Sequence, residues 1–481
     1  MILTLFILCV LAVLAALLLP HARSIFSVVS ILSTAIFAAA GFVAVPIMLG
    51  IAPALQWGFW YLDPFASTFL LVISFLQWTA TLASVPYLGY ELHEREIALA
   101  DVRRYFALLN AFVLSMMFSV SVNNLGLMWV ALEATTLATT LLVAFYPRKG
   151  SLEAAWKYIV LCSTGISLGL IGLLLTYNAA SGTGGSIDWT YLLSLAPTLS
   201  PGMMKLAFIF VLIGYGTKVG LVPMHAWLPD AHSRAPAPIS ALLSGVLLNA
   251  ALFSIIRYKM LVDGALHASD WTNWLLLFFG VLSCIVPAAF ILIQTDYKRL
   301  LAYSSIEHMG ITTMLFGLGP VGTLAAIIHL VGHALIKSML FFGAGNILLA
   351  FKSTKFERVG DVLRRMPYTG GFFLFGLLAL LAVPPSPLFL SEVLLFSGLV
   401  GAHPYALTIV ALALALIGAG FFMRIMPMLF SPAGESMRET REGFDVSHAA
   451  MALHAALVVA FGFALWSGGL SVISFIASSI H

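Results

Sequence analysis

Long apolar segments recur along almost the whole chain, and they constrain its fold more than any other feature. Hydrophobic residues make up 61% of the 481 residues and charged residues only 9%, and the mean hydropathy is +1.04. An apolar run of about 20 residues can cross a lipid bilayer as a helix. Because backbone polar groups in lipid need partners within the protein, we expect each run to be helical. The composition therefore predicts an all-α polytopic membrane protein.

About fourteen transmembrane helices are expected. Windows of about 19 residues, divided at charged residues and at Pro/Gly clusters, separate them. Their predicted extents are residues 2–19, 25–46, 65–88, 104–121, 124–146, 156–177, 203–224, 239–261, 272–294, 299–318, 321–350, 370–400, 404–430 and 448–475. The first run lacks the basic start and the small-residue cleavage site of a secretory signal, so we expect it to be retained as a span.

The positive charges predict the direction in which the spans cross. Lys and Arg accumulate in the cytoplasmic connections of membrane proteins. Of the 23 Lys and Arg residues here, nearly all follow odd-numbered spans or lie at the adjoining helix ends. The exceptions are Lys205, Arg257 and Lys259, which follow even-numbered spans, and Lys218 and Lys337, which lie inside spans. We therefore expect an even number of spans, with both termini on the non-cytoplasmic side.

Two clusters of prolines interrupt predicted spans. The seventh span runs into GTKVGLVPMHAWLPDAHSRAPAPIS, and the twelfth contains AVPPSPLFLSE. Proline removes a backbone donor and breaks a helix. Within a membrane an interrupted helix survives only where protein or water surrounds it, and paired broken helices indicate a transport pathway.

The two breaks lie five spans apart, which predicts two five-helix repeats. An odd number of helices in each repeat inverts the second relative to the first. We expect a three-helix N-terminal segment at 1–103, a first repeat of spans 4–8 at 104–262, a second repeat of spans 9–13 at 263–430 and a C-terminal helix at 431–481.

Ionisable residues inside the predicted spans are the candidate functional residues. A charge at mid-bilayer costs about 2.5–3.5 kcal/mol on insertion scales, so each one needs a reason. The candidates are Glu133, Lys218, Glu307, His308, His329, His333, Lys337 and Glu392. Each one alone could be a structural ion pair or hydrogen bond between helices. As a set that includes both broken spans, they predict a proton pathway.

The stretch HLVGHALIKSMLFF places His329, His333 and Lys337 four residues apart, on one face of the eleventh span. Histidine titrates near neutrality, so a row of this kind can exchange protons at physiological pH. Metal binding by the two histidines is the less favoured alternative, because no Cys or carboxylate stands at ligand spacing on the same helix.

The chain offers no site for a redox cofactor or a catalytic reaction of its own. Its three cysteines, Cys9, Cys162 and Cys284, are isolated in apolar surroundings, which argues against iron–sulfur, nickel and zinc sites. No Gly-rich phosphate loop follows a strand. A net charge of +3 gives no reason to expect a nucleic-acid partner. Any redox chemistry must therefore occur on a partner.

Four segments resemble the antiporter-like proton-translocating subunits of respiratory complex I, namely EATTLATTLL, GTKVGLVPMHAWLPDAH, DYKRLLAYSSIEHMG and HLVGHALIKSMLFF. LEATTLATTLLVAFY, SLEAAWKYI and SSIEHMG are most similar to component F of hydrogenase-4 and related group 4 membrane hydrogenases, since complex I subunits usually differ at Glu307. The resemblance runs from about span 4 to span 13. It implies fourteen helices with two inverted repeats, in a prokaryotic cytoplasmic (inner) membrane.

The resemblance also implies roles for individual residues. Glu133 and Lys218 would form the ion pair of a first half-channel, and Glu392 would be the exit group of a second. The central link would consist of His329, His333 and Lys337.

One position departs from the family pattern. Asn249 stands where complex I subunits of this type often carry a bridging lysine in the eighth span. An amide can hydrogen-bond and hold water but cannot carry a proton. We therefore expect the two halves to be connected through water, His225 or another group.

Three functions stay open at this point. The leading hypothesis is a proton-translocating subunit of a redox-driven complex, of the hydrogenase-4 or NADH-quinone oxidoreductase type. Its partners would be other membrane subunits and a peripheral redox arm with iron–sulfur and, in a hydrogenase, nickel–iron sites. The alternatives are a subunit of a multisubunit sodium/proton antiporter, which would also transport sodium, and a non-conducting scaffold for a catalytic arm.

Overall fold

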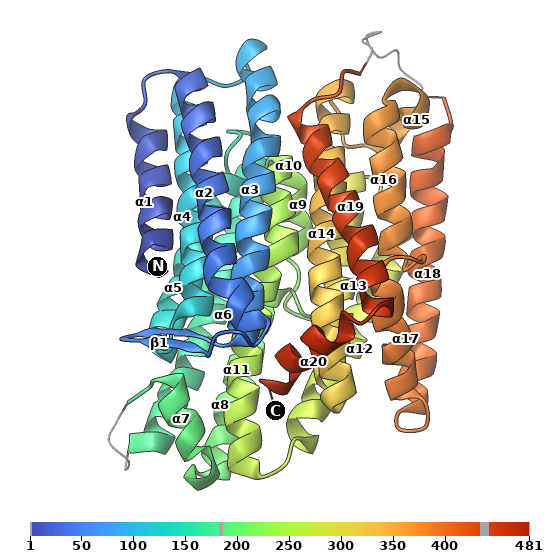
Figure 1. Ribbon diagram of the computed structural model, residues 1–481. Helices are drawn as coiled ribbons and strands as arrows, with labels where there is room; N and C mark the ends of the chain where they lie inside the picture. Colours follow the sequence, from blue (N-terminus) through green and yellow to red (C-terminus); the bar gives the residue numbers. More distant parts are fainter. Residues whose placement is uncertain (1, 182–185, 433–441, 481) are drawn as a thin grey trace.

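Helices make up most of the chain (Figure 1). The computed structural model describes residues 2–181, 186–432 and 442–480. Met1 and His481, whose side of the membrane the charges predict, lie outside the described residues, as does part of the predicted C-terminal segment, residues 433–441.

Eleven helices in the described part of the chain are long and apolar enough to cross a membrane. They are α2 (Ala22–Met48), α3 (Pro64–His93), α4 (Leu99–Ser121), α5 (Leu125–Val143), α6 (Lys149–Ala180), α8 (Pro201–Val219), the continuous α10–α11 (Ala237–Leu266), α12 (Asp270–Ile291), α14 (Gly319–Phe351), α18 (Pro404–Phe430) and α19 (Val446–Trp466). Three shorter apolar helices are α1 (Ile2–Leu18), α16 (Pro367–Leu380) and α17 (Pro387–Leu399). The predicted all-α polytopic class is confirmed.

The remaining elements are short or polar. Helix α13 (Tyr297–Phe316) has 20 residues but carries Lys298, Arg299 and Glu307. The others are α7 (Trp189–Leu195), α9 (Leu228–Arg234), α15 (Val362–Arg365), α20 (Leu470–Ser478) and an antiparallel pair of strands, β1 (Leu55–Trp57) and β2 (Trp60–Leu62). The composition gave no sign of this strand pair.

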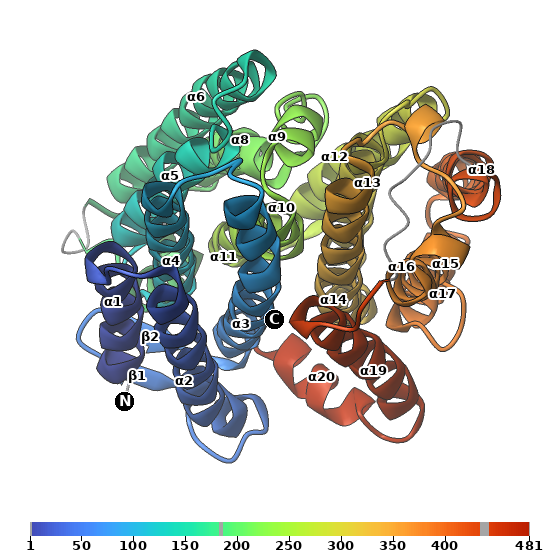
Figure 2. The same ribbon diagram turned by 90° about the horizontal axis from the view of Figure 1, so that it is seen from above.

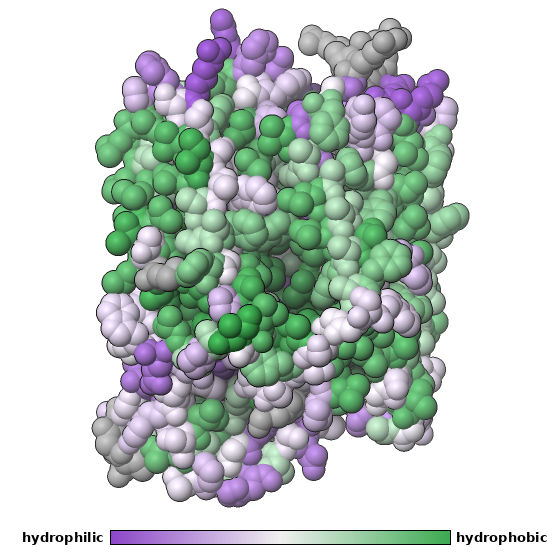
Figure 3. Space-filling view, viewed as in Figure 1, coloured by the Kyte–Doolittle hydropathy of each residue, from purple (hydrophilic) through white to green (hydrophobic). Residues whose placement is uncertain are grey.

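The surface and the arrangement of helices fit a protein that lies in a bilayer. Figure 3 shows a broad hydrophobic band between two ends where hydrophilic residues gather. Seen from above, helices α1–α11 group on one side and α12–α18 on the other, with α3 and α14 lining the border (Figure 2). The C-terminal helix α19 packs against both α14 and α3.

Both proline clusters interrupt helices, as the sequence predicts. Helix α8 ends at Val219, and α9 and α10 follow after a non-helical segment. Helix α16 ends at Leu380, and α17 begins only at Pro387. Helices α10 and α11 continue each other through one π-helical turn, Leu243–Leu247.

The prediction of a single helix over 448–475 was wrong. Helix α19 ends at Trp466, and α20 turns aside to contact α3 and α14. The cause is the pair Gly468 and Gly469, because Gly468 adopts a φ of 116° that other residues avoid.

A buried ion pair fixes the start of α3 against α11. The guanidinium of Arg257, counted above among the exceptions to the charge bias, donates to both carboxylate oxygens of Asp63 at 2.6 and 2.8 Å. Asp63 also caps α3 by accepting from the amide of Ala66 at 2.8 Å. The guanidinium lies 4.2 Å from the ring centroid of Trp189, so an aromatic face covers the charge.

Glycines bring α6 and α8 into close contact, and this contact positions the end of α8. A Cβ on Gly214 would lie 2.4 Å from the backbone nitrogen of Gly169, and one on Gly165 would lie 2.6 Å from Cβ of Thr217. Small residues at such an interface let two helix backbones approach closely. The approach sets the position of Lys218, four residues after Gly214.

We expect Gly214→Ala to lower the free energy of unfolding by about 1–3 kcal/mol, because its methyl group would meet the backbone of α6. Gly202→Ala is the matched control on α8, since no atom lies within 4 Å of its Cβ position. Thermal unfolding of the purified protein in detergent measures both variants. Equal stability of the two would contradict the close packing of α6 on α8.

Candidate functional site

Lys218 is fully buried near the C-terminal end of α8. Its ammonium donates to the carbonyl of Leu132 at 2.5 Å and to the hydroxyl of Thr136 at 2.6 Å, both on α5. Glu133 does not contact it directly. Its carboxylate instead accepts from Thr136 at 3.3 Å and from Ser163 of α6 at 2.8 Å. The structure therefore connects the expected ion pair through the hydroxyl of Thr136.

Lys337 lies in a similar environment in the other half of the protein. It is fully buried on α14, and its ammonium donates to the carbonyl of Leu301 at 2.8 Å and to the hydroxyl of Ser304, both on α13. Glu307 follows Ser304 by three residues on the same helix, and its buried Oε2 has no hydrogen-bond partner within the part of the chain that the structure describes. Each lysine thus binds one carbonyl and one hydroxyl of a neighbouring helix that also carries a glutamate.

The histidines of α14 meet His308 of α13. Nε2 of His329 lies 3.0 Å from Nδ1 of His308, and Nδ1 of His329 lies 2.9 Å from the hydroxyl of Ser391. That hydroxyl donates to the carbonyl of Leu388, so it accepts from His329. Nε2 of His329 therefore accepts a hydrogen bond from Nδ1 of His308. The hydrogen bonds of this row thus run in one direction, from His308 through His329 to Ser391. Among the described residues, neither ring nitrogen of buried His333 has a hydrogen-bond partner.

Glu392 of α17 faces this row across a cavity. The cavity has a volume of about 190 Å³ and is lined by Glu307, His308 and Glu392 together with apolar residues of α16 and α18. Two carboxyl groups and an imidazole therefore share one internal space beside the second interrupted helix. The sequence placed Glu307 and His308 on one helix but gave no reason to expect Glu392 beside them.

The same side chains could hold a metal ion. The ligand atoms of His308, His329 and Glu392 all lie within 4.8 Å of one another. His329 has no Cys or carboxylate at ligand spacing on its own helix, but here the carboxylate comes from another helix, α17. Two imidazoles and a carboxylate form a donor set of the kind that binds zinc.

Asn249 and a serine pair lie where the two halves meet. The amide of Asn249 donates to the carbonyl of Gly245 at 2.7 Å, and its Oδ1 is buried without a partner. The hydroxyls of Ser244 and Ser305 lie 2.8 Å apart and connect the π-helical turn between α10 and α11 to α13. Ser305 is adjacent to Ser304, the residue that binds Lys337.

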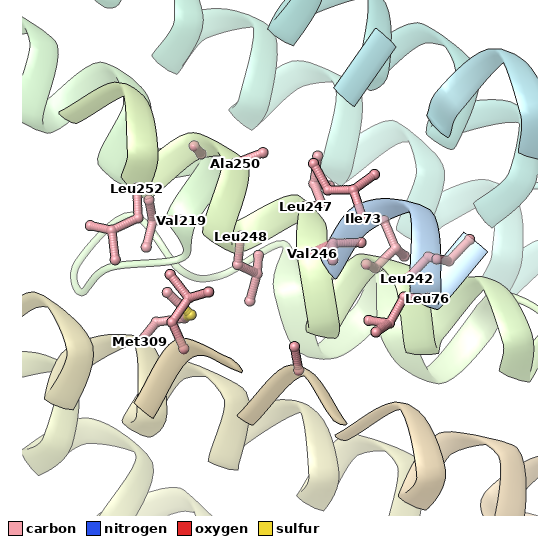
Figure 4. Close-up of a cluster of buried hydrophobic side chains, with 14 of the residues drawn as sticks. Ile73, Leu76, Val219, Leu242, Val246, Leu247, Leu248, Ala250, Leu252 and Met309 are labelled. Atoms are coloured by element: carbon pink, nitrogen blue, oxygen red, sulfur yellow. The ribbon is translucent and has the colours of Figure 1, made fainter. Parts of the chain in front are cut away.

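Apolar side chains fill the space around this contact. Val219, Leu248 and Met309 lie close together between the two halves (Figure 4). The serine pair therefore crosses an apolar interface. His225 lies in the segment between α8 and α9, is only partly buried, and its Nδ1 has no partner.

Among the described residues, four further acidic, basic or histidine side chains that are 3% exposed or less were not expected to be buried from the sequence. Nδ1 of His232 bonds the carbonyl of Leu228 at 2.9 Å, and its Nε2 has no partner. The others are Glu91, Lys298 and His454, each 3% exposed or less. Glu91 and Lys298 lie just outside the predicted spans, so the sequence gave no reason to expect them to be buried. His454 lies within the last predicted span, where a lone histidine gave no pattern.

The comparisons with known proteins agree with this arrangement. The family described as "NADH:quinone oxidoreductase/Mrp antiporter, TM" matches residues 122–418. The chain belongs to this family. All the candidate residues from Glu133 to Glu392 lie within the matched part of this antiporter family, so the predicted resemblance is confirmed at the family level.

One relative in this family is similar over most of its length. It is the Hydrogenase-4 component F homolog of Methylacidiphilum infernorum (isolate V4), 38% identical over 384 residues, which are 79% of this chain and 80% of the relative.

Two solved structures show the same fold. A chain of the membrane-bound sulfane sulfur reductase, an archaeal respiratory membrane complex, superposes with a TM-score of 0.84 at 23% identity, covering 99% of this chain and 96% of that one. A chain of the Mrp complex from Dietzia sp. DQ12-45-1b superposes with a TM-score of 0.85 at 18% identity, covering 99% and 97%.

Proposed function

We propose that the chain is a proton-translocating, antiporter-like membrane subunit of a redox-driven complex of the hydrogenase-4 or NADH-quinone oxidoreductase type. The observation that carries this proposal is the pair of fully buried lysines, Lys218 and Lys337, each held by a carbonyl and a hydroxyl of a neighbouring helix. The similarity to the Hydrogenase-4 component F homolog supports it.

The first half-channel consists of Glu133, Thr136 and Lys218. A buried ammonium is stabilised when a carboxylate approaches and releases its proton more readily when the carboxylate withdraws. Thr136 contacts both groups, so a small movement of α5 against α8 changes the distance between them. The driving movement would come from a neighbouring subunit, because the sequence predicts that redox chemistry occurs on a partner.

The second half-channel consists of Lys337, the histidine row and Glu392. A proton that reaches His308 can pass to His329 along the hydrogen bond between them, because each imidazole can donate at one nitrogen and accept at the other. His333 lies one helical turn from both His329 and Lys337, and neither of its ring nitrogens bonds to another described residue. The cavity at Glu307 and Glu392 provides room for the water that completes the exit.

The connection between the half-channels passes Asn249 and the serine pair. Ser244 and Ser305 bond across the interface, and Ser305 stands next to Ser304. A hydroxyl can donate and accept at once, so the pair can transmit a change in hydrogen bonding where no lysine stands. This route supports a connection that does not need a charge on residue 249.

The proposed topology and assembly follow from the same arrangement. It has fourteen spans with both termini on the non-cytoplasmic side of a prokaryotic cytoplasmic (inner) membrane, and two inverted repeats at 104–262 and 263–430. The interrupted helices α8 and α16–α17 support the repeats. The partners are other membrane subunits and a redox arm with iron–sulfur and, in a hydrogenase, nickel–iron sites.

Purification of the native complex and identification of its subunits tests the proposed function. Copurification with redox subunits, together with proton uptake driven by their electron transfer, is the expected result. Small antiporter subunits and sodium-dependent proton exchange would instead assign the chain to a sodium/proton antiporter. Redox activity without proton uptake would leave it as a scaffold.

We expect Lys337→Met to assemble but to abolish proton translocation, because methionine keeps much of the side-chain volume without the charge. Lys337→Arg should be nearly as damaging, since arginine does not release its proton. Proton uptake by proteoliposomes that contain the whole complex measures both, with subunit content as a check on assembly. Lys149→Met, at an exposed lysine, is the control. Normal uptake by the arginine variant would mean that Lys337 is a fixed charge.

We expect Thr136→Val to slow proton uptake about tenfold or more, because a hydrogen bond to a charged group contributes about 1.5–3 kcal/mol. Valine has nearly the same shape but cannot connect Lys218 to Glu133. Thr136→Ser keeps the hydroxyl and should stay close to the parental rate. Proton uptake in the same proteoliposome assay measures both variants. Equal rates for Thr136→Val and Thr136→Ser would mean that Thr136 is not part of the pathway.

A further inference from the structure

A second cavity lies apart from the lysines and histidines of the proposed pathway. Its volume is about 240 Å³, and five basic residues line it: Arg148, Arg234, Lys298, Lys352 and Lys355. They come from the start of α6, the end of α9, the start of α13 and the connection after α14. The cavity therefore lies where both halves of the protein meet at one end of the bundle.

The positive charge in this cavity is only partly neutralised. No acidic residue lines it. Lys352 pairs with Glu96 at 2.8 Å, and Lys355 lies 3.8 Å from Asp296. Within the described parts of the chain, Arg148, Arg234 and Lys298 form no ion pair. Glu91, which accepts from the lining Tyr146, is a third carboxylate nearby. Five clustered cations still outnumber these carboxylates, so a bound anion would stabilise them.

Lys298 is the cation of this cavity that most needs a further hydrogen-bond acceptor. Its side chain is 1% exposed, and its ammonium donates to the carbonyl of Ala235 at 2.7 Å. A buried charge is costly unless it is paired, and one carbonyl is a weak partner for a group with three donors. An anion in the cavity would supply the missing acceptors.

The neighbouring groups favour an anion with several oxygens. The guanidinium of Arg234 lies against the first turn of α6. Its carbon is 3.1 Å from the position that a Cβ on Gly150 would occupy. A long helix presents partial positive charge and free amides at its N-terminus, which suits phosphate. Two guanidinium groups can add paired hydrogen bonds to a tetrahedral oxyanion. The cavity is larger than a phosphate group, so it could also hold part of the molecule to which the phosphate is attached.

We propose that this cavity binds the phosphate group of an anionic molecule, either a phospholipid headgroup or a free phosphate. The Lys352–Glu96 pair places it at the same end of the bundle as the α3–α4 connection, the upper end in Figure 1. The charge pattern of the sequence predicts this end to be cytoplasmic. The bound phosphate would contact Arg148 and Arg234 from one half and Lys298 and Lys352 from the other, so it would hold the two halves together.

Thermal unfolding of the full chain in nanodiscs tests the proposal. One arm compares inorganic phosphate with chloride at equal ionic strength in phosphatidylcholine nanodiscs. The other compares phosphatidylcholine nanodiscs with nanodiscs that also contain phosphatidylglycerol or cardiolipin. A higher unfolding midpoint in the first arm identifies free phosphate as a ligand, and a higher midpoint in the second arm alone identifies a lipid headgroup.

The double variant Arg148→Gln/Arg234→Gln should lose at least half of that rise. The double variant Lys149→Gln/Arg95→Gln removes the same charge from exposed positions outside the cavity and should keep it. If the first variant does not accumulate, the rise in unfolding midpoint is measured with the single variant Arg234→Gln. Arg234 is exposed, so this substitution should be tolerated. No rise in either arm, or a rise that the cavity variant keeps, would overturn the proposal.

Discussion

The cost of burying an ammonium group in an apolar bundle is the constraint on which the rest of the site depends. Lys218 and Lys337 are both fully buried, and neither touches a carboxylate. Each needs oxygen acceptors from the protein itself, and each finds them in a carbonyl and a hydroxyl of one neighbouring helix. The helix packing around both lysines therefore has to be exact, and the glycines between α6 and α8 provide it for Lys218.

The interrupted helices serve the same requirement. Because α8 stops at Val219, Lys218 lies in its last turn, where the partial negative charge of the helix end favours a cation. The break between α16 and α17 opens the cavity in which Glu307, His308 and Glu392 meet. A continuous helix would fill that space with its own backbone. The prolines thus position charged groups as well as end helices.

The border between the two halves combines apolar packing with polar contacts at several places. Near the centre the serine pair crosses the side chains shown in Figure 4. At one end the basic cavity joins residues of both halves. The halves also meet where Ser283 accepts from the amide of Val222 and where Arg299 pairs with Asp230, so both apolar packing and polar contacts connect them.

The sequence by itself determined the membrane class, the two helix breaks, the family and the identity of the ionisable candidates, because these depend on local composition and on proline chemistry. It also placed His329, His333 and Lys337 on one face, since helical periodicity is local. The turn at Gly468 that separates α20 from α19 was equally local but was hidden within an apolar run.

Only the tertiary structure decided which groups meet. Thr136 between Lys218 and Glu133, Ser391 on His329, the approach of Glu392 to His308 and the serine pair beside Asn249 all join residues of different helices. The five cations of the second cavity likewise come from four separate segments of the chain. Composition and periodicity report how each helix faces its surroundings. The packing of one helix on another depends on side-chain shapes along both, and this information is absent from any single segment.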